Sequence, residues 1–330
     1  MKYMKIGKSD IEASVITLGA MGIGGGTWWR GSDDEDSIKT IHRALDLGIN
    51  TIDTAPVYGF GHSEEVIGRA IRGNRSIYII STKCGLWWDD DEGSFRFEKD
   101  GHRVTRNLTS HAIRTEIERS LKRLGTDYID IYYTHNPACP PVMTPPEETV
   151  GTLMDLKKEG KIRAIGSSNM TPDEIRTYTS LGDIDIIQGH YSMLDRSAEK
   201  EILPLCREKG LSFHAYMALE RGILTGNVKR DYVVQPGDAR ADSALWRSGN
   251  FEAVLDFVDG LKDISEDYQC TCTHLAIAFL LAQGNDINVI SGARRVFQIE
   301  DIARAADVTL LDGDVREIEK RLEALKNKIH

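Results

Sequence analysis

Two side chains that can exchange protons lie close together in the stretch NTIDTAPVYGFG, residues 50–61. The run from residue 49 to residue 54 is apolar and β-branched, which predicts a short buried strand ending near Asp53. Tyr58 follows among a proline and two glycines, which predicts a turn. A carboxylate and a phenol would then share the carboxyl end of one strand. The alternative, an N-cap aspartate beside a half-buried tyrosine, stays open for this pair alone.

The strands predicted downstream also end on polar or aromatic residues. Residues 77–83 end on Lys83, and residues 127–135 end on His135. Three later strands follow the same rule: residues 162–169 end on Ser168 and Asn169, residues 183–188 on Gln188, and residues 211–216 on Tyr216. Amphipathic helices separate these strands, and in a barrel of parallel strands all carboxyl ends face one mouth. The pattern therefore predicts one site built from six consecutive strand ends.

Strands predicted at residues 15–18 and 287–291 complete a set of eight. We therefore expect an α/β protein, a single (β/α)8 TIM barrel domain over residues 1–330, a length that such barrels commonly use. Residues 1–13 read as an N-terminal hairpin that caps the bottom of the barrel, and amphipathic helices are expected at the C-terminus. Residues 219–248 form an insertion too long and too mixed for a simple connection.

Charge and composition exclude several classes of partner. The formal net charge is −10 and no dense basic patch occurs, so neither nucleic acid nor an anionic membrane is expected as a partner. No segment has the length and apolarity of a signal peptide or a membrane span. The five cysteines are odd in number and scattered, and the histidines do not cluster, so we expect free thiols, no metal site and a cytoplasmic location.

The four titratable strand-end residues form a plausible proton-transfer set. A tyrosine has an ordinary pKa of about 10. A lysine about 4 Å away contributes about 4 kcal/mol at an effective dielectric of about 20, which equals about three pKa units. Lys83 would thus let Tyr58 give and take a proton near neutrality, as a general acid–base must. Asp53 would keep Lys83 protonated, and His135 would donate a hydrogen bond to a carbonyl oxygen.

Asp53, Tyr58, Lys83 and His135 resemble, in order and strand position, the catalytic tetrad of the aldo-keto reductases. The motifs TIDTAPVYGFGHSEE, STK, YYTH, GSSN and VISGARRVFQIED are also similar to that superfamily, across nearly the whole chain. The likeness is greatest to the bacterial branch of sugar and inositol reductases. The resemblance implies a (β/α)8 barrel that binds a nicotinamide dinucleotide without a Rossmann unit.

The resemblance also implies which residues hold the dinucleotide. The family's cofactor-binding positions correspond here to Gly19, Ala20, Met21, Asp53, Ser168, Asn169, Gln188, Tyr216, Leu219, Arg221, Leu224, Gly292, Arg294, Gln298 and Asp301. Tyr216 resembles the aromatic residue on which the nicotinamide stacks, and residues 219–248 would cover the pyrophosphate. Arg294 and Arg295 could both reach a 2′-phosphate, so we expect NADPH to be preferred over NADH. Two departures, Asn227 for a frequent lysine and Ile302 for a usual asparagine, are expected to weaken cofactor binding somewhat.

The function that follows is an NADP(H)-dependent oxidoreductase that interconverts a carbonyl and its alcohol, with Tyr58 as general acid–base. We expect the substrate-binding residues to be Trp28, Trp29, Trp87, Trp88 and Asn136, whose flat rings and amide suit sugar-like or polyol-derived carbonyl compounds. The alternative for these tryptophans is packing of the loops against the rim of the barrel. Two other functions remain open: a Schiff-base aldolase with Lys83 as nucleophile, and an NADP(H)-binding regulatory subunit with negligible turnover. The sequence gives no indication of the oligomeric state.

Overall fold

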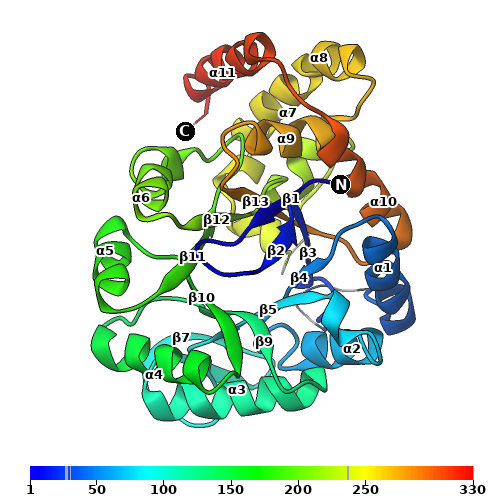
Figure 1. Cartoon of the computed structure of the whole chain (residues 1–330). Helices are drawn as coiled ribbons and strands as arrows, with labels where there is room; N and C mark the ends of the chain where they lie inside the picture. Colours follow the sequence, from blue (N-terminus) through cyan, green and yellow to red (C-terminus); the bar gives the residue numbers. More distant parts are fainter. Residues whose placement is uncertain (27–28, 30, 236–237, 330) are drawn as a thin grey trace.

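The computed structural model describes residues 1–26, 29, 31–235 and 238–329. Eight parallel strands close into a barrel in the order β10-β11-β12-β13-β3-β4-β5-β9 (Figure 1). Their bounds are β3 Ile16–Gly19, β4 Thr51–Asp53, β5 Ile79–Cys84, β9 Ile129–Thr134, β10 Ile162–Ser168, β11 Ile184–His190, β12 Ser212–Tyr216 and β13 Ile287–Gly292. The predicted TIM barrel is confirmed, and its strands lie within a few residues of the expected ranges.

Helices surround the barrel and follow its strands in turn (Figure 1). They are α1 Asp34–Asp46, α2 His62–Ala70, α3 Ser110–Leu124, α4 Pro146–Lys158, α5 Pro172–Leu181, α6 Ile202–Lys209, α9 Cys272–Leu281 and α10 Val296–Arg304. Helix α3 illustrates why these segments are helical. Thr109 caps its first turn through Ala112 N–H, Ile113 and Ile117 are buried on one face, and Gly125 ends it in the left-handed conformation.

The N-terminal hairpin closes the barrel at the end away from the strand termini. Strands β1 (Tyr3–Lys5) and β2 (Glu12–Ser14) pair antiparallel and lie over the centre of the ring in Figure 1. Ile6, Ile11 and Ala13 are buried and pack against the barrel side chains Ile79, Ile131, Tyr133, Ala164 and Ile186. The predicted cap is therefore present, and the mouth at the opposite end is left for the site.

A small sheet that the sequence did not predict follows Lys83. Strands β6 (Leu86–Trp87), β7 (Ser94–Lys99) and β8 (His102–Arg106) form it in the order β6-β8-β7. The long connection between Lys83 and α3 is thus an ordered structure beside the carboxyl end of β5. The insertion expected at residues 219–248 contains the short 3-10 turns η3 Glu220–Thr225, η4 Ala239–Asp242 and η5 Ala244–Trp246.

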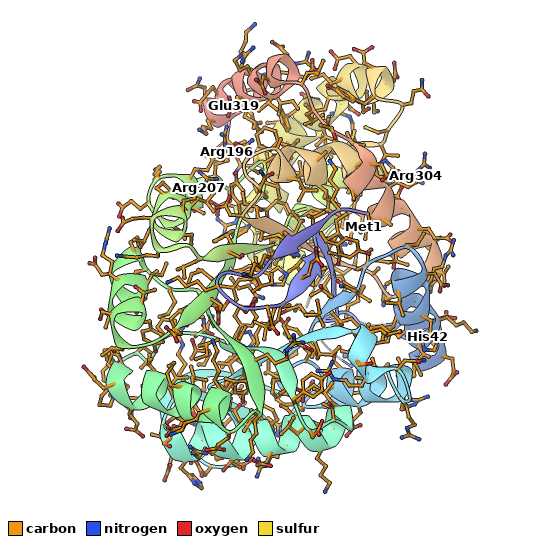
Figure 2. The ribbon with its side chains drawn as sticks, in the orientation of Figure 1. Met1, His42, Arg196, Arg207, Arg304 and Glu319 are labelled. Carbon is orange, nitrogen blue, oxygen red and sulfur yellow. The ribbon has the colours of Figure 1, made fainter. Side chains whose placement is uncertain are left out.

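The C-terminal part departs from expectation in one helix. The apolar spacing of residues 251–268 predicts one helix, but the structure has two, α7 (Asn250–Gly260) and α8 (Lys262–Asp267), separated at Leu261. Helix α11 (Asp312–Lys326) contacts α7, and Glu319 of α11 forms a 2.7 Å ion pair with Arg196 (Figures 1 and 2). None of the helices described is both long and apolar enough to cross a membrane.

Candidate active site

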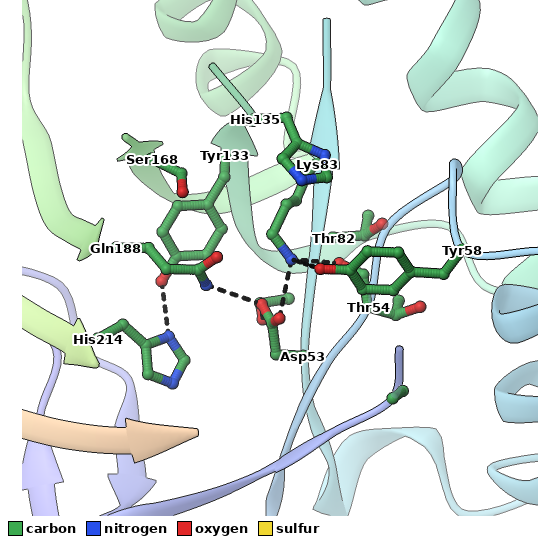
Figure 3. Close-up of polar contacts among 12 residues, drawn as sticks. Asp53, Thr54, Tyr58, Thr82, Lys83, Tyr133, His135, Ser168, Gln188 and His214 are labelled. Atoms are coloured by element: carbon green, nitrogen blue, oxygen red, sulfur yellow. Dashed lines mark hydrogen bonds and ion pairs between the residues drawn. The ribbon is translucent and has the colours of Figure 1, made fainter. Parts of the chain in front are cut away.

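Lys83 lies at the centre of the polar cluster at the barrel mouth. Its ammonium group donates to Asp53 Oδ2 at 2.8 Å, to the backbone oxygen of Thr54 at 2.7 Å and to the Tyr58 hydroxyl at 3.5 Å (Figure 3). Its side chain is 1% exposed, so this cation has three oxygen partners in place of water. Burial lowers the pKa of Lys83, but the charge of Asp53, the interaction with Tyr58 and the hydrogen bonds to both together outweigh burial and hold the pKa above the ordinary value. Lys83 is therefore a fixed cation.

Asp53 balances that charge from the neighbouring strand. Its second carboxylate oxygen accepts from the Ser81 hydroxyl at 2.8 Å. The same oxygen accepts from the Gln188 amide at 3.0 Å (Figure 3). Burial raises the pKa of Asp53, yet the attraction of Lys83 prevails and lowers it below the ordinary value. The Asp53–Lys83 pair thus stays ionised and has no net charge. Gln188 connects the pair to the opposite side of the barrel.

Tyr58 is carried by the turn after β4, and the fold fixes this turn closely. Tyr58 N–H donates to Ala55 O at 3.1 Å. A Cβ added to Gly24 would lie 2.7 Å from the backbone carbon of Tyr58, so only glycine fits there. Burial raises the pKa of Tyr58 above its ordinary value, and the attraction of Lys83 does not offset it. The expectation of a phenol titrating near neutrality is corrected accordingly: Tyr58 keeps its proton and can act as a donor.

His135 faces Tyr58 across the mouth. The two rings meet edge to face with centroids 6.0 Å apart, and the His135 ring is half-buried. Burial, and then the charge of Lys83, lower the pKa of His135 to about 3. The imidazole is therefore neutral at physiological pH, and a neutral imidazole can donate one hydrogen bond to a carbonyl oxygen.

The polar ends of β10 and β12 meet beside this set. The Tyr216 hydroxyl donates to Asn169 Oδ1 at 2.7 Å, and the Asn169 amide donates to His135 O at 2.9 Å and to Ser168 Oγ at 3.1 Å. Asn169 has a φ of +61°, a left-handed backbone that asparagine tolerates better than most residues. The structure therefore brings Ser168, Asn169, Gln188 and Tyr216 together with the four titratable residues.

His190 supports Tyr216 from behind, and the sequence did not single it out. The two rings stack with centroids 5.7 Å apart at 15°. His190 Nε2 pairs with Glu220 at 2.6 Å and its Nδ1 with Asp195 at 3.2 Å. Burial lowers the pKa of His190, but these carboxylates outweigh burial and raise it. The signal that could have revealed it is its place two residues beyond Gln188, at the end of β11.

The segment that carries the cofactor-binding candidates Gly292, Arg294, Gln298 and Asp301 runs from the end of β13 into α10. Arg294 N–H donates to Gln298 Oε1 at 3.1 Å, and Asp301 forms a 2.9 Å pair with His274. The pair with His274 holds the Asp301 carboxylate in place, and because the side chain is 41% exposed the carboxylate is still accessible. Gly19 and Gly292 are paired in the barrel register, with Ala20 and Met21 directly after Gly19.

Residues Leu219 to Leu224 form a tight, irregular turn. Glu220 and Arg221 have positive φ values of 46° and 57°. The downstream segment holds them, since Arg240 donates to Arg221 O at 3.1 Å and Trp246 Nε1 to Glu220 O at 3.3 Å. Arg221 Nε is buried and, within the part of the chain that the structure describes, has no hydrogen-bond partner. A buried donor left without a protein partner fits a site for an anionic group such as a pyrophosphate.

The two tryptophans of the small sheet that were expected to bind substrate lie in different surroundings. Trp88 packs edge to face on Phe60, which stacks on His102, close to the Tyr58 turn. Trp87 is buried, donates to Asp90 at 2.7 Å and has Arg119 of α3 over its ring, so it packs the small sheet against α3 rather than lining the mouth.

Three further residues complete the set expected to bind substrate. Asn136 follows His135 and is half-buried, and Trp29 lies near Gly22 in the first loop. Trp28 lies outside the described residues. Among the described residues, no group of three or more His, Cys, Asp or Glu side chains could hold a metal ion.

Comparison with known proteins identifies the family. The family model described as aldo/keto reductase matches residues 15–323. The chain is 44% identical over 329 residues to the NADH-specific methylglyoxal reductase of Escherichia coli (strain K12), which covers 99% of this chain and 100% of the relative. The chain belongs to the aldo/keto reductase family.

Two further aldo/keto reductase matches cover nearly whole chains. A Bacillus subtilis aldo-keto reductase is 37% identical, over 98% of this chain and 94% of its own length. The structure of a glycerol dehydrogenase from Gluconobacter oxydans superimposes with a TM-score of 0.89 at 34% identity, covering 98% of this chain and 95% of the other. The predicted resemblance to this family is confirmed.

The expected preference for NADPH is wrong. The relative that is 44% identical over its full length is named NADH-specific, which points to NADH. The expectation weighed only the positive charges of Arg294 and Arg295, whereas the same segment also carries the carboxylate of Asp301, which pairs with His274 at 2.9 Å.

Proposed function

We propose that this aldo/keto reductase uses NADH to reduce small 2-oxoaldehydes, compounds of the methylglyoxal type, with Tyr58 as the proton donor. The observation that carries the proposal is the 44% identity, over the full length of both chains, to a protein named for that reaction. The cluster at the mouth supports it, because it places a protonated phenol 3.5 Å from a fixed cation.

Each member of the tetrad would have one task. A bound reduced nicotinamide supplies the hydride. Tyr58 gives its proton to the carbonyl oxygen, and Lys83 stabilises the phenolate that remains. Asp53 keeps Lys83 charged and in place, and neutral His135 donates a hydrogen bond that orients the carbonyl.

The dinucleotide would lie along the strand ends from β10 to β13. Ser168, Asn169 and Gln188 offer hydroxyl and amide groups for the carboxamide, and Tyr216 offers a ring for stacking. Asp301 would bind the ribose hydroxyls, which supports NADH. Arg221, with its buried unpartnered Nε, would bind the pyrophosphate.

Oxidation or reduction of polyol-like compounds is the second candidate. The structural neighbour from Gluconobacter oxydans is titled a glycerol dehydrogenase, and Trp88 and Asn136 next to the tetrad suit a hydroxylated substrate. A Schiff-base aldolase has less support, because a nucleophilic lysine must lose its proton and the pKa of Lys83 is raised. A regulatory subunit has less support still, because the full-length relative is named for a reductase activity.

Steady-state kinetics on the purified chain test the proposal. The substrates are methylglyoxal, butyraldehyde and a sugar aldehyde, each with NADH and NADPH, together with glycerol and NAD⁺ for the reverse reaction. We expect kcat/KM for methylglyoxal to be highest, and at least about tenfold higher with NADH than with NADPH, equal to about 1.4 kcal/mol. A higher kcat/KM for glycerol or the sugar would favour the second candidate. Equal use of both cofactors would contradict the assigned role of Asp301.

A further inference from the structure

Strand β7 contains an irregularity next to the active site. In its pairing with β8, Phe95 lies opposite Thr105 and Phe97 opposite Val104. Thr105 and Val104 are consecutive, so Arg96 is an extra residue with none opposite it, a β-bulge. Bulges change the direction of one side chain and are frequent beside active sites.

The neighbours of the bulge hold this part of β7 beside the barrel mouth. Ser94 is buried, and its hydroxyl donates to the backbone oxygen of Cys139 at 2.5 Å, in the loop that follows His135. Phe97 packs against the apolar cluster that includes Tyr58 and Trp88. Ser94 and Phe97 thus hold β7 against the loop after His135 and against the Tyr58 turn, and Arg96 lies between these two contacts, in the part of β7 that borders the barrel mouth.

The charge of Arg96 is available at this position. The residue is exposed, and across the described residues it makes neither a hydrogen bond nor an ion pair. Its field reaches the site: after burial and Lys83, Arg96 is among the groups that lower the pKa of His135. Within the tetrad, the charges of Asp53 and Lys83 cancel, and Tyr58 and His135 are neutral. Arg96 thus adds positive charge to a mouth whose tetrad carries no net charge.

We propose that Arg96 is a specificity-determining residue that binds an anionic group on the substrate, next to the carbonyl that is reduced. The chemical class is a small aldehyde with an α-carboxylate, of which glyoxylate is the simplest. This inference rests on the proposed carbonyl reduction and extends its substrate range from neutral 2-oxoaldehydes to anionic ones. The guanidinium would hold the carboxylate by charge-assisted hydrogen bonds while His135 and Tyr58 bind the aldehyde oxygen. The reaction converts the aldehyde, NADH and one proton to glycolate and NAD⁺.

A matched pair of substrates and a matched pair of arginines test this inference. Glyoxylate carries a carboxylate next to its aldehyde, where methylglyoxal carries an acetyl group. Both aldehydes are partly hydrated in water, but the hydrated fraction is the same for every variant and does not affect the comparison between variants. The variants are Arg96→Gln, Arg96→Lys and the control Arg103→Gln. Arg103 belongs to the same hairpin but lies over the exposed ring of Phe95, at 4.9 Å from its centroid, and 3.4 Å from Asp91.

We expect Arg96→Gln to lower kcat/KM for glyoxylate by about 10- to 100-fold, the usual effect of losing a charge-assisted bond. The value for methylglyoxal should stay within about threefold, Arg96→Lys should recover part of the loss, and Arg103→Gln should change neither. Raising the ionic strength should reduce the glyoxylate value of the wild type more than that of Arg96→Gln.

Three outcomes would overturn the inference. Equal losses for both substrates would show that Arg96 only holds the sheet, and no loss for either would show that it does not touch substrate. An unmeasurable wild-type rate with glyoxylate, beside a good rate with methylglyoxal, would also overturn it. Failure of the proposed function itself is distinguishable, because then neither aldehyde is reduced by the wild type.

Discussion

Tyr58 and Lys83 lie 3.5 Å apart, and the proton on Tyr58 is nevertheless held more firmly than in water. Burial raises the pKa of the phenol. The Lys83 ammonium group lies closer to the Asp53 carboxylate, at 2.8 Å, which neutralises much of its effect on Tyr58. A site of this kind is prepared to donate a proton rather than to accept one. Lys83 then acts mainly after the transfer, when its ammonium group faces a phenolate.

Replacement of Tyr58 by phenylalanine tests this role. Tyr58→Phe removes one oxygen and leaves the ring, so we expect kcat to fall by about 100-fold or more, the usual contribution of a positioned acid. NADH affinity, measured by fluorescence titration, should change less than about threefold, since the hydroxyl acts in the chemical step. Residual turnover within about tenfold of the wild type would rule out Tyr58 as the acid.

Asp301 is expected to set the preference for NADH. Asp301→Asn keeps an acceptor for His274 and removes the charge, so kcat/KM with NADPH should rise about tenfold, equal to about 1.4 kcal/mol. The matched control is Glu300→Gln, because the neighbouring carboxylate pairs with Arg43 at 2.8 Å instead. If both variants shift the NADPH value equally, the effect is one of net charge and Asp301 does not contact the ribose.

Strand ends were the most predictable feature of this site. Lys83, Gln188 and Tyr216 each end an apolar run, and a barrel brings such ends together whatever the loops do. The pKa of Tyr58 could not be predicted, because burial of its ring depends on packing against the small sheet, 28 residues or more further along the chain. His190 was missed because its partner Glu220 belongs to another strand–loop connection.

Elements with short or interrupted patterns were harder to predict than the barrel itself. In strand β7 the alternation of apolar and polar residues is limited to Phe95, Arg96 and Phe97, and a β-bulge interrupts the strand at this point. Helix α7 ends at Gly260, although the apolar spacing continues to Tyr268. In both cases the pattern of apolar residues does not by itself determine the element. Strand β7, for example, pairs with β8 in the small sheet and not with a strand of the barrel.

The contact between β11 and β12 gives a test at the level of these elements. His190→Ala removes the ring behind Tyr216 and the pair with Glu220. We expect the KM for NADH to rise about 3- to 10-fold, the usual value of an aromatic pair, with kcat changed less than about threefold. Steady-state kinetics with varied NADH measure this split.

Two variants of the same residue separate stacking from pairing. His190→Phe keeps a ring and loses the pair, and His190→Gln keeps a hydrogen bond to Glu220 and loses the ring. Recovery of KM by phenylalanine alone would assign the effect to stacking, and recovery by glutamine alone would assign it to Glu220. If His190→Ala lowers kcat and leaves KM unchanged, His190 does not position the nicotinamide platform.

The stability of the folded barrel should depend on pH through a buried carboxyl group that the chemistry does not use. Glu116 of α3 is buried; its Oε2 accepts from Gly85 N–H at 2.7 Å, and among the described residues its Oε1 has no partner. Burial raises its pKa to about 8, and the nearby Glu64 adds to the rise. Glu116 thus joins α3 to Gly85, the residue just before the small sheet and two positions after Lys83.

The sign of this dependence follows from which state holds the proton. Glu116 in an unfolded chain titrates near its ordinary pKa of about 4.3. Between that pH and about 8 the folded state binds one more proton than the unfolded state. The free energy of unfolding therefore falls as pH rises through this window, by at most about 1.4 kcal/mol per pH unit, and is constant in this respect on either side.

Glu116→Gln removes that titration and keeps an oxygen for Gly85 N–H. We expect the variant to gain roughly 2–4 kcal/mol in unfolding free energy relative to the wild type on going from pH 5 to pH 8. Urea denaturation at several pH values measures this difference. Glu118→Gln is the control, because that carboxylate lies on the same helix, is 58% exposed and pairs with Lys161, so its difference from wild type should stay flat. A Glu116→Gln difference that is also independent of pH would show that Glu116 is already ionised in the folded barrel.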